Sequence, residues 1–477
     1  MLIILRGAAA GYEAEHTARL FFPGADRADT FPDSGDAVAA LAGEVTHMVL
    51  LRLNDTVVWR TAPAPEGDGE YALCTLLYEL LCQQTGITPP WGMMTGVRPV
   101  RIIHDLRAAG TPESEIESHF LTHFRCTPQK FRLARGIADL QRPVLEGADP
   151  MDCSVYAGIP FCPSRCSYCS FVSRTVGDKA TQALVQPYVD KLCQELTAIR
   201  RTVDRCGLRV RTLYIGGGTP TSLSAAQLTQ LMGHIADIFD LSALDEYTVE
   251  AGRPDCTDAE KLHILKQYGA TRISINPQTF SDAVLANIGR RHTAQDIADC
   301  FAAARQAGHR NINMDLIVGL PGEDKIMVEN TLNEVKALAP DSITVHSLAV
   351  KRAARLNIFK DKYQEMTFEN NQEIMDMTMK IAYEMEMGPY YLYRQKNMKG
   401  NFENVGYAKV DKAGIYNILI MEEKQPIIAL GAGGSSKLVF DQGKRIERVE
   451  NVKDVTNYID RIDEMIERKR KGINTWL

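Results

Sequence analysis

The middle of the chain repeats one pattern, in which a short apolar run is followed by a longer amphipathic stretch. Strands that alternate with helices in this way predict a parallel α/β sheet. Six such units are too few for a closed eight-stranded barrel, so we expect a partial, open barrel. The expected strands are Ser154–Gly158, Thr212–Gly216, Tyr247–Ala251, Arg272–Asn276, Asn313–Val318 and Ile343–Leu348, and the helices start near Ala180, Ala225, Asp258, Ala294 and Lys325.

The first 150 residues show a different pattern, which predicts a separate α+β module. Met1–Leu5 reads as a strand, and Val45–Thr61 reads as a hairpin with turn residues at its centre. Tyr71–Gln84 is an amphipathic stretch that ends at a glycine, which predicts a helix. Two or three further helices are expected between Arg98 and Leu145, and Gly147–Pro150 is a plausible boundary.

Beyond residue 360 the alternation is lost, which predicts an α+β extension over residues 361–477. We therefore expect three domains, with the barrel over residues 151–360 and an extension that covers the substrate pocket. The extension should contain a Met-rich helix at Phe368–Met387, strands at Tyr390–Arg394, Ile415–Ile420 and Pro426–Leu430, a glycine-rich run from Gly431, and a charged helix at Val452–Arg470.

Composition excludes several classes of protein. The chain has 477 residues, 45% hydrophobic and 24% charged, with a formal net charge of −6, which disfavours broad electrostatic capture of nucleic acid. No signal peptide is recognisable, and no run reaches the roughly 18 to 20 apolar residues of a membrane span. A cytoplasmic protein is expected. The 11 cysteines are an odd number in a long chain, which disfavours a disulfide framework.

Three of the cysteines cluster directly after the first expected strand. Cys162, Cys166 and Cys169 have the spacing C-x3-C-x2-C, and thiolates are the usual protein ligands of iron–sulfur clusters. Three ligands on a four-iron cluster leave one iron free for another molecule. A zinc site would need a fourth protein ligand nearby, and Cys153, nine residues before Cys162 and across the strand, is a poor candidate.

Polar residues follow the next strands at the edge where the ends of parallel strands meet. Gly216-Gly-Gly-Thr lets the backbone approach a ligand closely. Glu250 ends the third strand, where a carboxylate suits ribose hydroxyls. Asp315 lies inside an apolar strand, and a buried acid is costly unless it has partners. These residues predict a polar ligand site next to the cysteines.

The cysteine motif, with Tyr168 before its last cysteine, resembles the radical S-adenosylmethionine (SAM) superfamily. The string Tyr156-x-Gly-Ile-Pro-Phe-Cys resembles its oxygen-independent coproporphyrinogen III oxidase group, and Thr95-Gly-Val-Arg-Pro and Val249–Asp255 resemble the HemZ-like branch. The resemblance implies a partial (β/α)6 radical SAM barrel and a [4Fe–4S] cluster on Cys162, Cys166 and Cys169. The residues that it implies for SAM are Tyr156, Tyr168, Gly217, Gly218, Thr219, Glu250, Gln278, Asp315 and Arg290, with Arg291 as an alternative to the last.

The same resemblance implies a reaction in haem biosynthesis, the oxidative decarboxylation of porphyrinogen propionates, with an electron donor such as flavodoxin or ferredoxin. Two departures leave other functions open, because Phe171 stands where the best-known oxidases have a further cysteine and Asn276-Pro277 precedes Gln278 in place of Gly-Val. The alternatives are a haem-binding or haem-transfer protein, a haem-modifying radical SAM enzyme and, more distantly, a zinc-stabilised binding module. Candidate cations for the substrate carboxylates are Lys351, Arg352, Arg355, Arg394, Lys396, Arg98 and Arg101.

Overall fold

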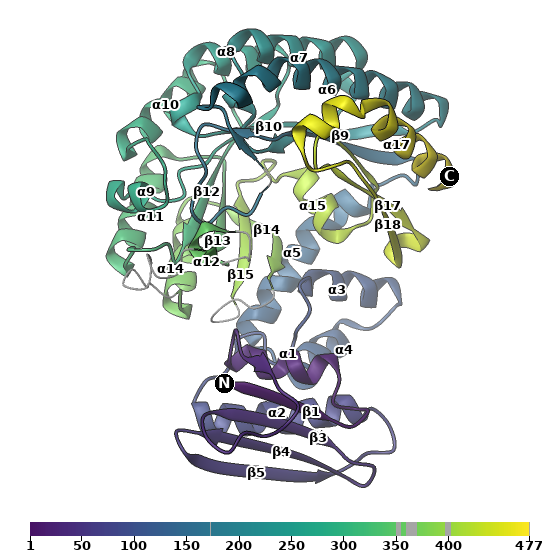
Figure 1. Cartoon of the computed structure of the whole chain (residues 1–477), viewed down its shortest axis with the longest axis vertical. Helices are drawn as coiled ribbons and strands as arrows, with labels where there is room; N and C mark the ends of the chain where they lie inside the picture. Colours follow the sequence, from purple (N-terminus) through teal and green to yellow (C-terminus); the bar gives the residue numbers. More distant parts are fainter. Residues whose placement is uncertain (172, 350–353, 359–369, 396–401, 477) are drawn as a thin grey trace. The chain divides into compact units, whose positions relative to one another are not determined.

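The computed structural model describes residues 1–476 except 172, 350–353, 359–369 and 396–401, together with all their side chains but those of 355, 357 and 442. The chain divides into two compact units (Figure 1). One comprises Met1–Ala138 and Leu392–Glu403, and the other comprises Asp139–Tyr391 and Asn404–Leu477. This division differs from the expected boundaries after residues 150 and 360.

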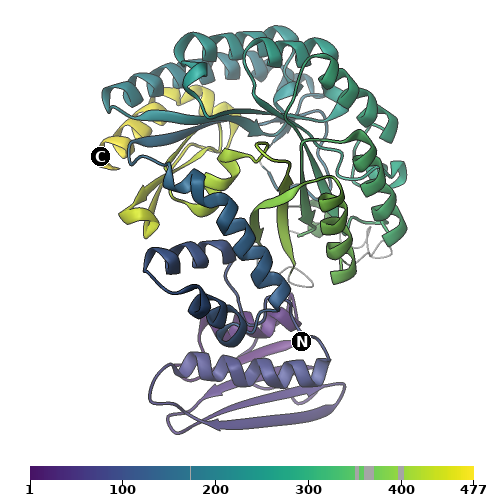
Figure 2. The ribbon, with the colours of Figure 1, turned by 180° about the vertical axis from the view of Figure 1, so that it is seen from behind.

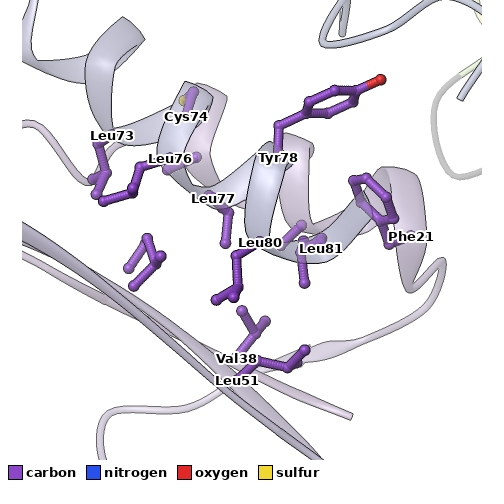
Figure 3. Close-up of a cluster of buried hydrophobic side chains, with 14 of the residues drawn as sticks. Phe21, Val38, Leu51, Leu73, Cys74, Leu76, Leu77, Tyr78, Leu80 and Leu81 are labelled. Atoms are coloured by element: carbon purple, nitrogen blue, oxygen red, sulfur yellow. The ribbon is translucent and has the colours of Figure 1, made fainter. Parts of the chain in front are cut away.

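The first unit is built on a five-stranded sheet with two helices packed on one face. The expected hairpin is confirmed, since β4 (Thr46–Leu53) and β5 (Thr56–Pro63) pair antiparallel. The expected helix is α2 (Gly69–Thr85), which begins after Asp68, a cap that accepts the N–H of Tyr71, and ends at Gly86 in the left-handed conformation. Its leucines pack against the sheet and α1 (Figure 3). The order is β2-β1-β3-β4-β5, and the other bounds are β1 Leu2–Arg6, α1 Tyr12–Phe21, β2 Asp26–Arg27 and β3 Ala37–Ala42.

Helices follow this sheet, as the sequence predicts. They are α3 (Pro99–Ala108), α4 (Glu113–Ser118) and α5 (Pro128–Glu146), with a π-helical turn at His119–His123. Within the first unit a buried ion pair joins Lys130 of α5 to Glu403, which also accepts the indole N–H of Trp91 at 2.8 Å. This pair ties the segment before residue 404 to the first unit.

The second unit contains the expected partial barrel. All six predicted strands are present, and they lie side by side in chain order, each parallel to the next. The fold prediction is therefore confirmed. The strands are β6 Asp152–Ile159, β9 Arg209–Gly217, β10 Glu246–Gly252, β11 Arg272–Ile275, β12 Ile312–Val318 and β13 Ser342–Ser347.

The helices between these strands arch over the outer side of the curved sheet (Figures 1 and 2). All six begin after a Ser, Thr or Asp whose side chain accepts a backbone N–H of the first turn. These caps explain why the starting points of five of the six could be predicted, the exception being the helix at Asp282–Asn287. The helices are α6 Lys179–Arg205, α7 Ala225–Ile238, α8 Ala259–Gln267, α9 Asp282–Asn287, α10 Ala294–Gln306 and α11 Lys325–Leu338.

C-terminal residues extend this sheet at both edges, which gives eleven strands in the part of the chain that the structure describes. β15 (Glu403–Ala408) pairs antiparallel with β13 at one edge. At the other edge, β16 (Ile427–Leu430) runs parallel to β6. The Met-rich helix is confirmed as α14, and the charged C-terminal helix is two helices, α16 and α17. The remaining bounds are α12 Arg355–Ile358, α14 Gln372–Glu384, β14 Gly388–Arg394, β17 Ser435–Phe440, β18 Arg445–Glu450, α16 Val455–Asp460 and α17 Ile462–Trp476.

One predicted element was wrong. Residues 415–420 were expected to form a strand because they are rich in β-branched and aromatic side chains, but they belong to helix α15 (Ile415–Glu422). The carboxylate of Glu246, at the start of β10, accepts the N–H groups of Ile415 and Tyr416 at 2.7 and 3.3 Å. A distant carboxylate therefore caps this helix, so no local capping signal precedes it.

α15 lies at the N-terminal end of the barrel strands, opposite the end from which the cysteine loop emerges. The ring of its Tyr416 stacks on Tyr214 of β9 at a centroid distance of 4.5 Å. Tyr156 of β6 continues the stack, 6.0 Å from Tyr214. This aromatic stack fills the barrel beneath the ends of the strands. Among the described helices, none is long and apolar enough to span a membrane.

Candidate functional site

The three motif cysteines lie on a loop that is closed at its base. Cys162 ends the short strand β7 (Phe161–Cys162), which follows β6 and pairs with β8 (Arg174–Thr175). Cys166 is buried, and Cys162 and Cys169 are partly buried. The pairing at the base holds all three thiols at the carboxyl end of the first barrel strand.

Contacts with the other side of the barrel fix the middle of this loop. The hydroxyl of Ser164 donates to the carbonyl of Gly289 at 2.9 Å. The N–H of Ser167 donates to the carbonyl of Ile288 at 3.0 Å. Since both carbonyls follow α9, the loop is anchored beyond the fourth strand as well as at the first.

The glycine loop after β9 packs directly against the cysteine loop. The N–H of Thr219 donates to the carbonyl of Phe161 at 2.7 Å, and its hydroxyl lies 3.7 Å from the sulfur of Cys162. A Cβ at Gly218 would collide with the Phe161 carbonyl oxygen, and Gly217 has a φ of +106°. Both glycines are therefore required for the approach of the two loops.

Two arginines, Arg253 and Arg290, approach the buried thiol of Cys166. Arg253, just after β10, donates to the Cys166 sulfur at 3.6 Å and to the carbonyl of Ser164 at 3.1 Å. Arg290 donates to the hydroxyl of Tyr168 at 3.2 Å and also interacts with Cys166. Both guanidinium groups therefore lie beside a thiol that belongs to the cysteine motif.

Glu250 lies at the end of β10, beside the glycine loop. Its carboxylate accepts the hydroxyl of Tyr214 at 2.6 Å. Burial raises the pKa of Glu250 to about 7, although the hydrogen bond from Tyr214 opposes this shift. A Cβ at Gly216 would lie 3.0 Å from this carboxylate, so the glycine leaves the space that Glu250 occupies.

Unsatisfied polar atoms gather where β11 ends. Gln278 has a φ of +70°, and its backbone bonds to both Asp315 and Ile317 of β12. Its side-chain oxygen is buried and has no hydrogen-bond partner among the described residues, and the same holds for the side-chain oxygens of Ser274 and Asn276. Buried oxygens without partners are costly, so this end of the strand suits a bound polar ligand.

The remaining predicted site residues lie near this region or below it. Asp315 accepts the side-chain amide of Asn313 at 2.7 Å, and His346 lies 4.0 Å from its other oxygen. Tyr156 lies in the aromatic stack, with its hydroxyl close to Gly217. Arg291 is exposed, whereas Arg290 is buried. Of these two neighbours, Arg290 is the one that contacts the cysteine loop.

Comparisons with known proteins show the family to which this chain belongs. The model of the radical SAM superfamily matches residues 156–335. The oxygen-independent coproporphyrinogen-III oxidase-like protein HemZ of Bacillus subtilis is 38% identical over 395 residues, which are 82% of this chain and 78% of that protein. The chain belongs to the radical SAM superfamily. Within it, HemZ-like proteins are its relatives over most of its length.

Two further proteins, one compared by sequence and one by structure, are also similar to this chain. The haem chaperone HemW of B. subtilis is 33% identical over 65% of this chain and 76% of its own length. The solved structure of the coproporphyrinogen III oxidase HemN of Escherichia coli is 23% identical and covers 69% of this chain and 73% of its own, with a TM-score of 0.52. The second likeness shows a shared fold.

The cofactors of a radical SAM protein are a [4Fe–4S] cluster and SAM, and the residues present fit both. Three thiols on one loop, two of them close to cations or hydroxyls, are a suitable donor set for a cluster. The described residues contain no group of three or more His, Cys, Asp or Glu side chains placed around a single metal ion. A four-iron cluster does not need such convergence, because each thiolate binds its own iron.

Only some of the candidate cations for substrate carboxylates belong to the described residues. Lys351, Arg352 and Lys396 lie outside the described residues, as does the side chain of Arg355. Arg394 is buried in the first unit, where it donates to the carbonyls of Met94 and Gly96 at 2.8 and 3.1 Å. Arg101 pairs with Asp105 at 3.4 Å, and Arg98 precedes α3.

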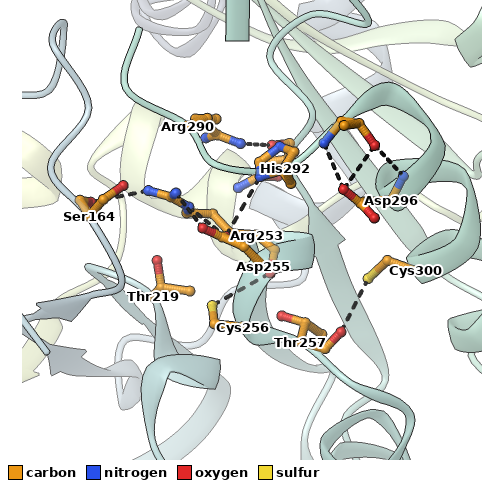
Figure 4. A network of polar contacts seen from close by, with 12 residues as sticks. Ser164, Thr219, Arg253, Asp255, Cys256, Thr257, Arg290, His292, Asp296 and Cys300 are labelled. Carbon is orange, nitrogen blue, oxygen red and sulfur yellow. Dashed lines mark hydrogen bonds and ion pairs between the residues drawn. The ribbon is translucent and has the colours of Figure 1, made fainter. Parts of the chain in front are cut away.

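Sequence reasoning missed three residues beside the cysteines. Arg253, Asp255 and His292 form a chain of contacts (Figure 4), and Arg253 extends this chain to Cys166. The available signal was the string Gly252-Arg-Pro-Asp at a strand end, which served only as a mark of the branch. An arginine in such a position usually faces solvent, and only the fold shows that it faces the cysteine loop.

Proposed function

We propose that this chain is a radical SAM enzyme of the coproporphyrinogen dehydrogenase type, which converts propionate side chains of a porphyrinogen to vinyl groups. The observation that carries the proposal is the gathering of polar residues from four successive parallel strands around the cysteine loop. When bound, the reduced cluster and SAM supply a 5′-deoxyadenosyl radical that abstracts hydrogen from substrate. Each propionate would lose one hydrogen atom to this radical, and then CO2 and one electron, which would pass to an external one-electron acceptor.

Cys162, Cys166 and Cys169 are proposed as the cluster ligands. Thr219 and Arg253 would donate hydrogen bonds to two of the three thiolates, and these bonds lie at 3.7 and 3.6 Å. Such donors orient ligands and stabilise their negative charge. The burial of Cys166 supports this role, because it excludes water and oxygen from that side of the cluster.

The next strands would hold SAM. The backbone at Gly217, Gly218 and Thr219 would bind its amino group, and Glu250 would accept hydrogen bonds from the ribose hydroxyls. The free side-chain oxygen of Gln278 supports a ligand that donates a hydrogen bond at this point. Asp315, Tyr168, Arg290 and Tyr156 complete the proposed pocket, with Tyr156 acting through the glycine loop rather than by direct contact.

The similarity to HemZ, an oxidase-like protein, supports a porphyrinogen as the substrate. One observation favours a second function, the binding or transfer of haem. The side chain of Phe171, two residues beyond the last motif cysteine, is 61% exposed, and the relative HemW is a haem chaperone. An exposed aromatic ring beside the cluster loop could pack against a flat macrocycle.

A substrate assay separates these functions. The protein is reconstituted with iron and sulfide without oxygen and incubated with coproporphyrinogen III, SAM and a reductant such as reduced flavodoxin. Mass spectrometry should detect harderoporphyrinogen and protoporphyrinogen IX, with one 5′-deoxyadenosine for each CO2 lost. Formation of 5′-deoxyadenosine without decarboxylation would reject the dehydrogenase. Tight haem binding without SAM turnover would favour haem transfer.

Matched cysteine variants test the site. Cys166→Ala should lose the cluster, its broad visible absorbance and SAM cleavage. Cys206→Ala is the control, because Cys206 lies at the end of α6, outside the cysteine loop. If both variants retained iron equally, the ligand assignment would be wrong.

A further inference from the structure

Arg253 is a buried arginine whose donors are divided between two partners. Its side chain is 4% exposed. Nε and Nη2 donate to the two carboxylate oxygens of Asp255 at 2.9 and 2.7 Å. Nη1 points the other way, to the Cys166 sulfur at 3.6 Å and the Ser164 carbonyl at 3.1 Å. The guanidinium therefore links the end of β10 to the middle of the cysteine loop (Figure 4).

We propose that Arg253 sets the reduction potential of the cluster by donating a hydrogen bond to the Cys166 thiolate, and that Asp255 holds it in position for this. The inference rests on the proposed assignment of the cluster ligands but not on the identity of the substrate. Arg253 is a positioning and tuning residue, since it acts on the cluster through a ligand.

The physical basis is the charge of the two redox states. Reduction adds one electron to the cluster and its thiolates, so a donor directed at a thiolate sulfur stabilises the reduced state more than the oxidised one. Hydrogen bonds to sulfur are among the features that set iron–sulfur potentials. Loss of the donor should therefore make reduction harder.

Asp255 gives the contact its direction. A bidentate carboxylate fixes the plane of a guanidinium, and Nη1 is then held toward the loop. His292 lies behind this carboxylate, with its Nδ1 3.6 Å from Oδ1 of Asp255. Because Asp255 balances the charge of Arg253, the effect on the cluster comes mainly from the directed N–H rather than from net charge.

Arg290 shares this environment. It approaches Cys166 from the segment after α9 and interacts with the same thiol, while its other donors are directed at the hydroxyl of Tyr168 and the carbonyl of Asn276. Removing Arg253 therefore leaves one cation beside the thiol while it deletes the N–H that Nη1 directs at the sulfur.

The test measures the potential rather than turnover. Wild type, Arg253→Met, Arg253→Gln and Arg253→Lys are reconstituted, and their iron content is determined. The midpoint potential without SAM is then measured by a redox titration followed by electron paramagnetic resonance. Arg310→Met is the control, because Arg310 is an exposed arginine of the same unit, two residues before β12.

We expect Arg253→Met to bind a full complement of iron and to lower the equilibrium constant for reduction about tenfold, which is about 59 mV for one electron. Arg253→Lys should show a smaller shift in the same direction, and Arg310→Met none. A potential for Arg253→Met that equals that of Arg310→Met would overturn the proposal.

If Arg253→Met does not bind iron, the potential of Arg253→Gln tests the proposal instead, because glutamine has a shorter side chain that still carries an N–H donor. A shift to lower potential in that variant supports the proposal. Failure of both variants to bind iron, while Arg310→Met does bind it, would overturn the tuning role in favour of a structural one. Failure of the proposed reaction would leave a wild-type cluster whose potential still responds to Arg253, so the two failures are distinguishable.

Discussion

Replacing Lys469 with methionine should destabilise the protein by about 3 kcal/mol. The side chains of Lys469 in α17 and Glu195 in α6 are only 1% and 0% exposed, and the ammonium lies 2.7 Å from the carboxylate. Methionine has a similar length and volume, so little cavity forms. The loss comes from a buried carboxylate that is left without its counter-ion.

The magnitude follows from the other partners of Glu195. It also accepts the hydroxyl of Tyr458 at 2.7 Å, the N–H of Gly431 at 2.8 Å and the amide of Asn451 at 2.9 Å. Removing one member of a buried ion pair costs about 3 to 5 kcal/mol. Since three neutral donors remain, we place the loss at the low end of this range.

The same change should weaken the cysteine loop. Gly431 and Ala432 follow β16, and the N–H of Ala432 donates to the hydroxyl of Tyr188 at 3.0 Å. That hydroxyl in turn donates to the carbonyl of Gly158 at 2.6 Å, shortly before Cys162. We therefore expect a lower cluster occupancy in Lys469→Met as well as a lower stability.

Urea unfolding of the apo protein, followed by circular dichroism and by tryptophan fluorescence, measures the first effect, and iron analysis after reconstitution measures the second. Lys471→Met is the matched control in the same helix, since that lysine is 75% exposed and lies 3.7 Å from Glu467. Its effect should stay within about 0.5 kcal/mol. Equal unfolding midpoints for the two variants would refute the reasoning.

Other predictions concern single side chains. Glu250→Gln should weaken SAM binding about tenfold or more in equilibrium dialysis, and unchanged affinity would exclude a role at the ribose. Burial raises the pKa of Glu250 from 4.5 in the unfolded chain to about 7, so the apo protein should lose stability as the pH rises between these values. Urea titrations should show a smaller decline in the variant. Lys130→Met should cost about 3 kcal/mol, because it leaves Glu403 buried without its ammonium, whereas Arg132→Met, which replaces an exposed residue of the same helix, should change the unfolding midpoint little. A similar loss in both would contradict the role of the pair.

Patterns within short windows were enough to predict the barrel. A buried parallel strand is a continuous apolar run, and each helix after it begins at a local Ser, Thr or Asp cap, so each of these signals can be recognised within its own short stretch of sequence. α15 lacks such a signal, because Glu246, far away in sequence, caps it. Its apolar, β-branched residues then matched a strand better than a helix.

The same limit applies to the site. The cysteines could be proposed as cluster ligands because their spacing alone indicates the chemistry, whereas the glycines were assigned to SAM only through the family resemblance. Arg253 and Lys469 look like solvated charges in the sequence, and Lys469 even lies in a run of charged residues, Glu467-Arg-Lys-Arg-Lys. Each is buried because a carboxylate lies opposite it, and that carboxylate is local for Arg253 but 274 residues distant for Lys469.

Part of the C-terminal segment packs against the first barrel strand and supports the cysteine loop from that side, while its expected role in covering a substrate pocket stays a prediction. β16 pairs with β6 along residues 154–157, and a Cβ at Gly431 would collide with the carbonyl of Gly158 and the hydroxyl of Tyr188. Only a glycine allows this contact, which brings the C-terminal segment against the strand that precedes Cys162. Because Glu195 binds Gly431 and Lys469 together, the last helix stabilises the same contact. The cysteine loop therefore depends for its position on residues that follow it by almost 300 positions, and it should not form in a chain that ends after the sixth barrel strand.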